Sequence, residues 1–175
     1  MQIDMPSHEH CRDLVERTGE PDVACLQQAA QHVAHDLYLL RHAWVDRSLR
    51  IGWTLWFITA RVLMDFFFRY ERTKGKDGKY TDDILAADFL PSGLWKPFGE
   101  SLVSERPADW AACRLVANKL SAHLTYSRVH LSASGPTPPS EGVHDYLLGV
   151  AGMWLDKLEP ARRAWFDPWF PTRAA

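Results

Sequence analysis

The stretch Ile51–Phe68, IGWTLWFITARVLMDFFF, is the most apolar segment of this 175-residue chain. On a helical wheel at about 100° per residue, the wider segment Leu49–Tyr70 is apolar nearly all round, which is typical of a helix at the centre of a bundle. Arg61 and Asp65 lie inside the segment, and a bilayer would make such a pair costly. The stretch therefore predicts a buried core helix and not a membrane span.

Helical spacing recurs on both sides of this stretch, and no strand-like alternation persists. We expect one all-α domain over residues 1–175, a bundle of about five helices with short connections. The predicted helical segments are about Ser7–Arg17, 20–44, Asp46–Arg72, Thr81–Ala87, 107–131 and Glu141–Trp165.

The segments between the helices have their own signals. Residues 89–97 read as an ordered apolar loop that packs across the bundle, and residues 132–140 read as a loop because three prolines and a glycine fall together. Pro160 is expected to kink the last helix. In the tail, residues 168–175, the stretch Trp169–Pro171 is either docked or disordered.

Composition and charge indicate which ligands and which cellular compartment the protein suits. Hydrophobic residues make up 46% and the formal net charge is −2, so binding to a polyanion must rely on a local basic patch. The three cysteines, Cys11, Cys25 and Cys113, are far apart, which favours a reduced, cytoplasmic compartment. The charged N-terminus is unlike a signal peptide.

The polar residues of the central helix share one side. Thr54, Arg61, Asp65 and Arg72 fall within about 40° of one another on the wheel, and Arg61 and Asp65 are four residues apart, so they can touch. Two interpretations stay open. The pair is a structural salt bridge between helices, or it forms an electropositive wall of a site.

The segment Asp109–Leu131 carries a second polar stripe, formed by Lys119, His123, Tyr126 and His130. An ammonium, two imidazoles and a phenol suit proton transfer and phosphate binding. The alternative is an exposed polar face with ordinary surface histidines. Three more polar residues, Arg114, Asn118 and Arg128, flank the core face of the same segment.

Three motifs resemble the HEPN (higher eukaryotes and prokaryotes nucleotide-binding) superfamily. Asn118–Arg128 (NKLSAHLTYSR) resembles its conserved helix, and Ala60–Phe67 (ARVLMDFF) is similar to the partner helix of small HEPN-like bacterial proteins. The stretch Asp82–Pro91 (DDILAADFLP) is also similar to that group. The resemblance implies a HEPN-like α-helical bundle that forms a homodimer, with a role in bacterial defence or toxin–antitoxin systems beside an antitoxin or defence partner.

The active members of that superfamily are metal-independent endoribonucleases. Their motif is an arginine and a histidine separated by four to six residues, often with a polar residue directly after the arginine. Here Asn118 and His123 match the polar residue and the histidine, but Ala117 stands at the arginine position. The resemblance therefore implies that a catalytic arginine comes from Arg61, Arg114 or Arg128, or from a second subunit.

The implied roles follow the chemistry of RNA cleavage. His123 is the base or acid, Arg61 or Arg128 the cation that stabilises the phosphoryl charge, and Asn118 an orienting group. The ligand would be RNA or a nucleotide, and Lys119, Tyr126, His130 and Asp65 are the expected substrate-binding residues. The alternative is a non-catalytic module for dimerisation, nucleotide sensing or partner binding.

Other constellations are weak. His32 and His35 with Asp36 could hold a metal only with a further ligand, and no second pair supports that hypothesis. Gly75 and Gly78 do not make a phosphate loop, because Lys79 and a tyrosine follow them in place of a P-loop helix. We expect no metal site and no cofactor.

Overall fold

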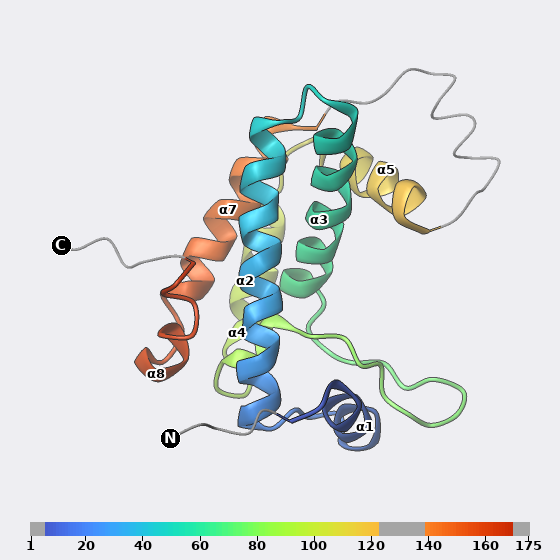
Figure 1. Cartoon of the computed structure of the whole chain (residues 1–175), viewed down its shortest axis with the longest axis vertical. Coiled ribbons are helices and arrows are strands. Elements are labelled where there is room, and N and C mark those ends of the chain that lie inside the picture. Colours follow the sequence, from blue (N-terminus) through green and yellow to red (C-terminus); the bar gives the residue numbers. More distant parts are fainter. Residues whose placement is uncertain (1–5, 123–138, 170–175) are drawn as a thin grey trace.

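The computed structural model describes residues 6–122 and 139–169 (Figure 1). Within these ranges the chain forms helices and no β-strand, which confirms the all-α prediction. The elements are α1 (His8–Thr18), α2 (Val23–Val45), α3 (Arg50–Phe68), η1 (Ala86–Phe89), α4 (Trp95–Leu102), η2 (Val103–Glu105), α5 (Trp110–Ala122), α7 (Glu141–Leu155) and α8 (Pro160–Arg163).

Helices α2 and α3 form a long hairpin, and α7 runs beside it, while α5 leaves the far side of α3 at an angle (Figure 1). The predicted core helix is confirmed, since Trp56, Phe57, Leu63, Met64 and Phe67 are at most 1% exposed. Residues Ile51–Phe68 form a helical segment long and apolar enough to cross a membrane, but half of that segment is buried inside the protein. A core helix meets the same criterion, so the segment is weak support for a membrane span.

Trp154 of α7 is the centre of the core. The centroid of its ring lies 5.2 to 5.9 Å from those of Phe66, Phe67, Phe89 and Phe166, and each pair meets edge to face. Its indole N–H donates to the carbonyl of Ala86 at 3.1 Å. Edge-to-face packing of this kind stabilises a core beyond the area that it buries.

The apolar segment 89–97 packs against the bundle as expected, but helix α4, which was not predicted, begins within it. Trp95 is 1% exposed and its indole N–H donates to the carbonyl of Phe67 at 2.8 Å, at the end of α3. Pro97 is the third residue of α4, where its missing N–H has no helical acceptor to lose. The first turn of a helix therefore tolerates the proline that had indicated a loop.

The predicted helix Thr81–Ala87 is wrong. Residues 81–85 form no helix, and a short 3-10 turn begins only at Ala86. Arg72 donates to the backbone carbonyl of Asp83 with Nε at 3.1 Å and Nη2 at 2.9 Å, so that carbonyl serves a tertiary contact. The carboxylate of Asp88 accepts the N–H of Leu85 at 2.9 Å, which fixes where the 3-10 turn starts.

The other predicted helices differ mainly at their ends. Helix α3 is shorter than Asp46–Arg72, and α5 is described only to Ala122, so residues 123–131 of the predicted helix lie outside the described residues. Pro160 does not kink a continuous helix. Instead, α7 ends at Leu155, and Pro160 occupies the first turn of α8.

Two segments are attached to the outside of the bundle. The ring of Trp169 packs on α2 against Tyr38 at 5.8 Å and His35 at 6.2 Å, so this part of the tail is docked, and residues 170–175 lie outside the described residues. Helix α1 ends at Gly19, whose φ of 78° is disfavoured for a residue with a side chain. A Cβ at Gly19 would also come within 3.0 Å of the ring of Tyr80.

The expectation of reduced cysteines is wrong for two of the three. Cys11 of α1 and Cys25 of α2 form a disulfide across 14 residues, while Cys113 is free and buried. Cys11 lies near the start of α1 and Cys25 in the first turn of α2. The disulfide therefore fixes α1 to the end of the long hairpin.

Reduction of this disulfide is expected to lower the free energy of unfolding by about 3 kcal/mol, because it frees a loop of about 15 residues in the unfolded chain. Denaturant unfolding with and without a reductant, both with a chelator present, measures the change. Cys11→Ser should start at the lower value and not respond to the reductant. An unchanged midpoint for the reduced wild-type chain would contradict the prediction.

Candidate functional site

The predicted contact between Arg61 and Asp65 is present. Arg61 Nε lies 4.0 Å from Asp65 Oδ2, one turn apart on α3. Arg114 of α5 also reaches this carboxylate, with Nη2 donating to Asp65 Oδ1 at 2.9 Å. Asp65 therefore links α3 to α5, and one carboxylate is placed between two guanidinium groups.

Arg61 and Asp65 open onto a surface cleft of about 390 Å³, which we call the α2–α3 cleft. It is lined by His32, Val33, Asp36, Ile58, Arg61, Val62, Leu63, Asp65, Phe66, Arg69, Asp83, Ile84 and Leu85. The cleft combines cationic, anionic and apolar side chains, and its volume falls in the range of small-molecule sites, about 300–1,000 Å³.

A second ion pair lies in the cleft. Arg69, directly after α3, donates to the carboxylate of Asp83, which belongs to the extended segment before η1. Both side chains are about 40% exposed, so solvent reaches the pair. An exposed pair contributes little to stability, about 0–1 kcal/mol, and its members can turn toward a ligand at small cost.

The cleft also contains Asp36, whose pKa is shifted by its surroundings. Burial raises its pKa above the ordinary value, and the nearby charges of His35 and His32 oppose that shift. A raised pKa makes Asp36 a better proton acceptor near neutral pH than an ordinary aspartate. His32 lines the same cleft, so one helix provides both a carboxylate and an imidazole.

The other predicted site residues do not line the cleft or lie outside the described part of the chain. Asn118 and Lys119 are half-buried on α5 and are not among the described residues that line the cleft. Four more, His123, Tyr126, Arg128 and His130, lie outside the described residues. Of the residues that the sequence assigned to the site, the structure brings Arg61 and Asp65 into contact.

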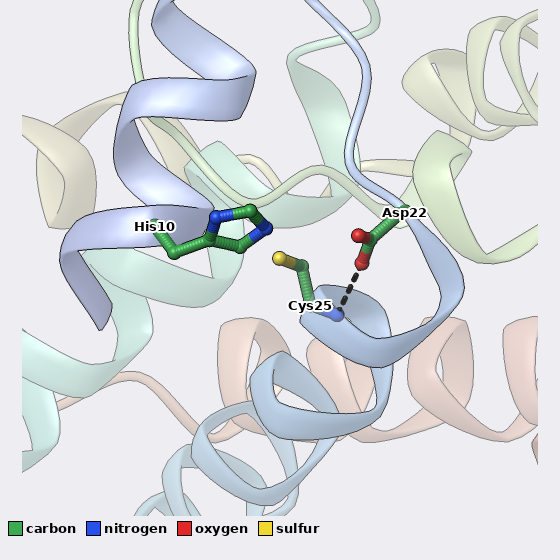
Figure 2. Close-up of side chains that lie close together, drawn as sticks. All are labelled: His10, Asp22 and Cys25. Atoms are coloured by element: carbon green, nitrogen blue, oxygen red, sulfur yellow. Dashed lines mark hydrogen bonds between the residues drawn. The ribbon is translucent and has the colours of Figure 1, made fainter. Parts of the chain in front are cut away.

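Sequence reasoning missed the part of the cleft that comes from other segments. Arg69 and Asp83 were not proposed, because nothing in the local pattern shows that the segment before η1 returns to the end of α3. His32 and Asp36 were weighed only as metal ligands with His35. In the described part of the chain, the group with metal-ligand spacing is a different one, His10 with Asp22 and Cys25 (Figure 2).

Two buried titratable groups belong to the core. His144 is 5% exposed and accepts the indole N–H of Trp56 on Nδ1 at 3.2 Å, while its ring stacks on Trp44 at 4.4 Å. Burial lowers the pKa of His144, which favours the neutral ring that this contact needs. Burial raises the pKa of the Cys113 thiol to about 11, so this cysteine is a poor nucleophile.

Comparisons of the chain with protein-family models, curated proteins and solved structures find no match. The resemblance to the HEPN superfamily therefore depends on the three motifs quoted from the sequence.

Proposed function

We propose that this chain is a HEPN-like protein of bacterial defence or toxin–antitoxin type that binds RNA or a nucleotide in the α2–α3 cleft. The observation that carries the proposal is the composition of the cleft. Arg61 and Arg69 provide guanidinium groups, Asp36 provides a carboxylate of raised pKa, and the walls are apolar.

A nucleotide suits such a mixed surface. Guanidinium groups bind phosphate oxygens in pairs of parallel hydrogen bonds, and a phosphate can replace a carboxylate as the partner of Arg61. The displaced carboxylates can accept from the amino groups of a base, as aspartate does at base edges. The apolar walls, including Ile58, Val62 and Ile84, can cover one face of the base.

Replacing Arg61 with alanine is expected to weaken binding of a fluorescent RNA oligonucleotide by about 10–100-fold, because a hydrogen bond to a charged group contributes about 1.5–3 kcal/mol. Fluorescence anisotropy at two salt concentrations measures the change, and the salt dependence should decrease in the variant. Arg17→Ala removes the same charge from an exposed position on α1 and should change little. Equal effects of both variants would show non-specific attraction and contradict a site in the cleft.

The second candidate is catalysis as a metal-independent endoribonuclease, with Arg61 as the cation. Its supporting observation is the position of Arg61, which reaches the cleft beside Asp65 and is 35% exposed. In this mechanism His123 takes the proton of a ribose 2′-OH, and the oxygen attacks the adjacent phosphate. A guanidinium stabilises the charge on the phosphoryl oxygens. Asn118 would orient the phosphate, while Lys119, Tyr126 and His130 would hold the RNA and Arg128 would supply a second cation.

A homodimer is part of the proposal, and α3 provides a surface for it. Ile51, Ile58 and Val62 are 77%, 38% and 45% exposed, and their spacing of seven and four residues places them on one face. Exposed apolar side chains that share a helix face are characteristic of a protein interface. Ile58 and Val62 also line the cleft, so a second chain on this face could complete the site.

Val62→Glu is expected to convert a dimer into a monomer, because it buries an unpaired charge at a two-fold interface. Sedimentation velocity at micromolar concentration measures the change in mass. Val45→Glu, at a position 73% exposed in the last turn of α2, is the matched control and should leave the mass unchanged. A wild-type chain that sediments as a monomer would contradict both the dimer and any site shared between subunits.

A further inference from the structure

Three side chains of different chemistry meet where α1 packs on the start of α2. The ligand atoms of His10, Asp22 and Cys25 all lie within 4.8 Å of one another. Figure 2 shows the imidazole of His10 directed at the sulfur of Cys25, with Asp22 on the other side. His10 comes from the first turn of α1, Asp22 is the N-cap of α2, and Cys25 belongs to the first turn of α2.

A fourth donor is adjacent. Cys11 follows His10 in the sequence, and its sulfur is bonded to that of Cys25. The four residues therefore form two short pairs, His10 with Cys11 and Asp22 with Cys25, held together by the disulfide. Two sulfurs, an imidazole and a carboxylate are the kinds of ligand that a tetrahedral zinc ion takes, and three of the four donors already lie within 4.8 Å of one another.

We propose that reduction of the disulfide between Cys11 and Cys25 creates a Zn²⁺ site with His10 and Asp22 as the other two ligands. Thiolates and imidazole favour zinc over magnesium or calcium, which prefer oxygen ligands. The ligand atoms of His10, Asp22 and Cys25 lie within 4.8 Å of one another, and the Cys11 sulfur, once released from that of Cys25, would complete the set. The site is independent of the α2–α3 cleft proposal.

A dithiol can supply the electrons and protons that reduction of the disulfide requires. The dithiol transfers two electrons and two protons to the disulfide, which gives two cysteine thiols and one oxidised dithiol. Each thiol then releases its proton as its sulfur binds Zn²⁺. Oxidation by a second disulfide reverses the sequence, removes two electrons from the thiolates and releases the ion.

The position of the sulfurs allows this exchange. Cys11 and Cys25 line a surface pocket of about 260 Å³, together with residues that include His8 and His32. Cys25 is buried, so a reductant would approach the bond through Cys11, which is half-buried. His10 and Asp22 are exposed, so an ion can reach them. Asp22 Oδ1 accepts the backbone N–H of Cys25 at 2.8 Å, and the carboxylate has a second oxygen for the ion.

Either state holds α1 against α2. In the oxidised chain the link is a covalent bond, and in the reduced chain it is the metal ion. Zinc should therefore restore to the reduced chain part of the stability that reduction removes, because a ligand that binds only the folded state stabilises it.

The test is a zinc titration of the full-length chain in competition with a chromophoric chelator, performed on the oxidised and on the phosphine-reduced protein. We expect one Zn²⁺ per reduced chain and affinity at least about 100-fold lower for the oxidised chain. Co²⁺ added to the reduced chain should give thiolate-to-cobalt charge-transfer bands and the visible absorption of a tetrahedral site. Equal affinity in the two redox states would overturn the proposal.

Variants locate the site. His10→Ala and Asp22→Asn change exposed side chains, and asparagine keeps the N-cap acceptor, so both chains should fold. Each should weaken Zn²⁺ binding by at least about 10-fold. His8→Ala should not, although His8 lines the pocket next to the two cysteines. If His8→Ala weakens binding and His10→Ala leaves it unchanged, the proposed ligand set is wrong.

Discussion

Replacing Arg72 with alanine is expected to lower the free energy of unfolding by about 3–5 kcal/mol, more than any other single charged side chain discussed above. The side chains of Arg72 and Asp88 are 7% and 8% exposed, and their ion pair measures 2.5 Å. Arg72 also donates to the backbone carbonyls of Gly19 and Asp83. Its loss leaves a buried carboxylate and two carbonyls without these donors, and unsatisfied buried polar groups are costly.

Denaturant unfolding of Arg72→Ala, Asp88→Ala and the double variant gives the coupling energy of the pair. Arg69→Ala is the matched control, because its partner Asp83 is on the same segment but the pair is half exposed, and its loss should cost about 0–1 kcal/mol. A loss below about 1 kcal/mol for Arg72→Ala would contradict a structural role for the pair.

Arg72 illustrates which features of the fold can be predicted from the sequence and which cannot. Helical periodicity identified the core helix and the all-α class, because those depend on patterns within one segment. The sequence also placed Arg72 on the polar side of the central helix, with Arg61 and Asp65. The pattern could not show that α3 ends at Phe68, which frees Arg72 to bind a segment that lies 11 to 16 residues later in the chain.

The same limit applies to the candidate site. The contact between Arg61 and Asp65 follows from a four-residue step on one helix and was predicted. The second partner of Asp65, Arg114, depends on how α5 crosses α3, and periodicity does not determine that crossing. The disulfide depends on the turn that brings α1 back onto α2. A tight turn at Gly19 and Pro21, roughly midway between Cys11 and Cys25, was the signal that could have indicated it.

Substitution of His123 by alanine is expected to reduce RNA cleavage by about 10²–10⁴-fold if the chain is an endoribonuclease, which is the typical contribution of a general acid or base. His123 lies outside the described residues, so the expectation rests on the HEPN resemblance and on its place in the stripe with Lys119. Cleavage of labelled RNA by the purified chain measures the effect. Activity should survive a chelator, because the 2′-OH attack needs no metal.

The control variants separate chemistry from binding. Lys119→Ala should weaken RNA binding more than turnover, because an ammonium beside a phosphate acts through charge and is screened by salt. His123→Ala should do the opposite and leave the free energy of unfolding unchanged. A wild-type chain that cuts no RNA would contradict the catalytic candidate and favour the non-catalytic binding module. In that case His123 is a structural histidine, and its replacement by alanine should cost about 1–3 kcal/mol of stability through an unpaired buried group.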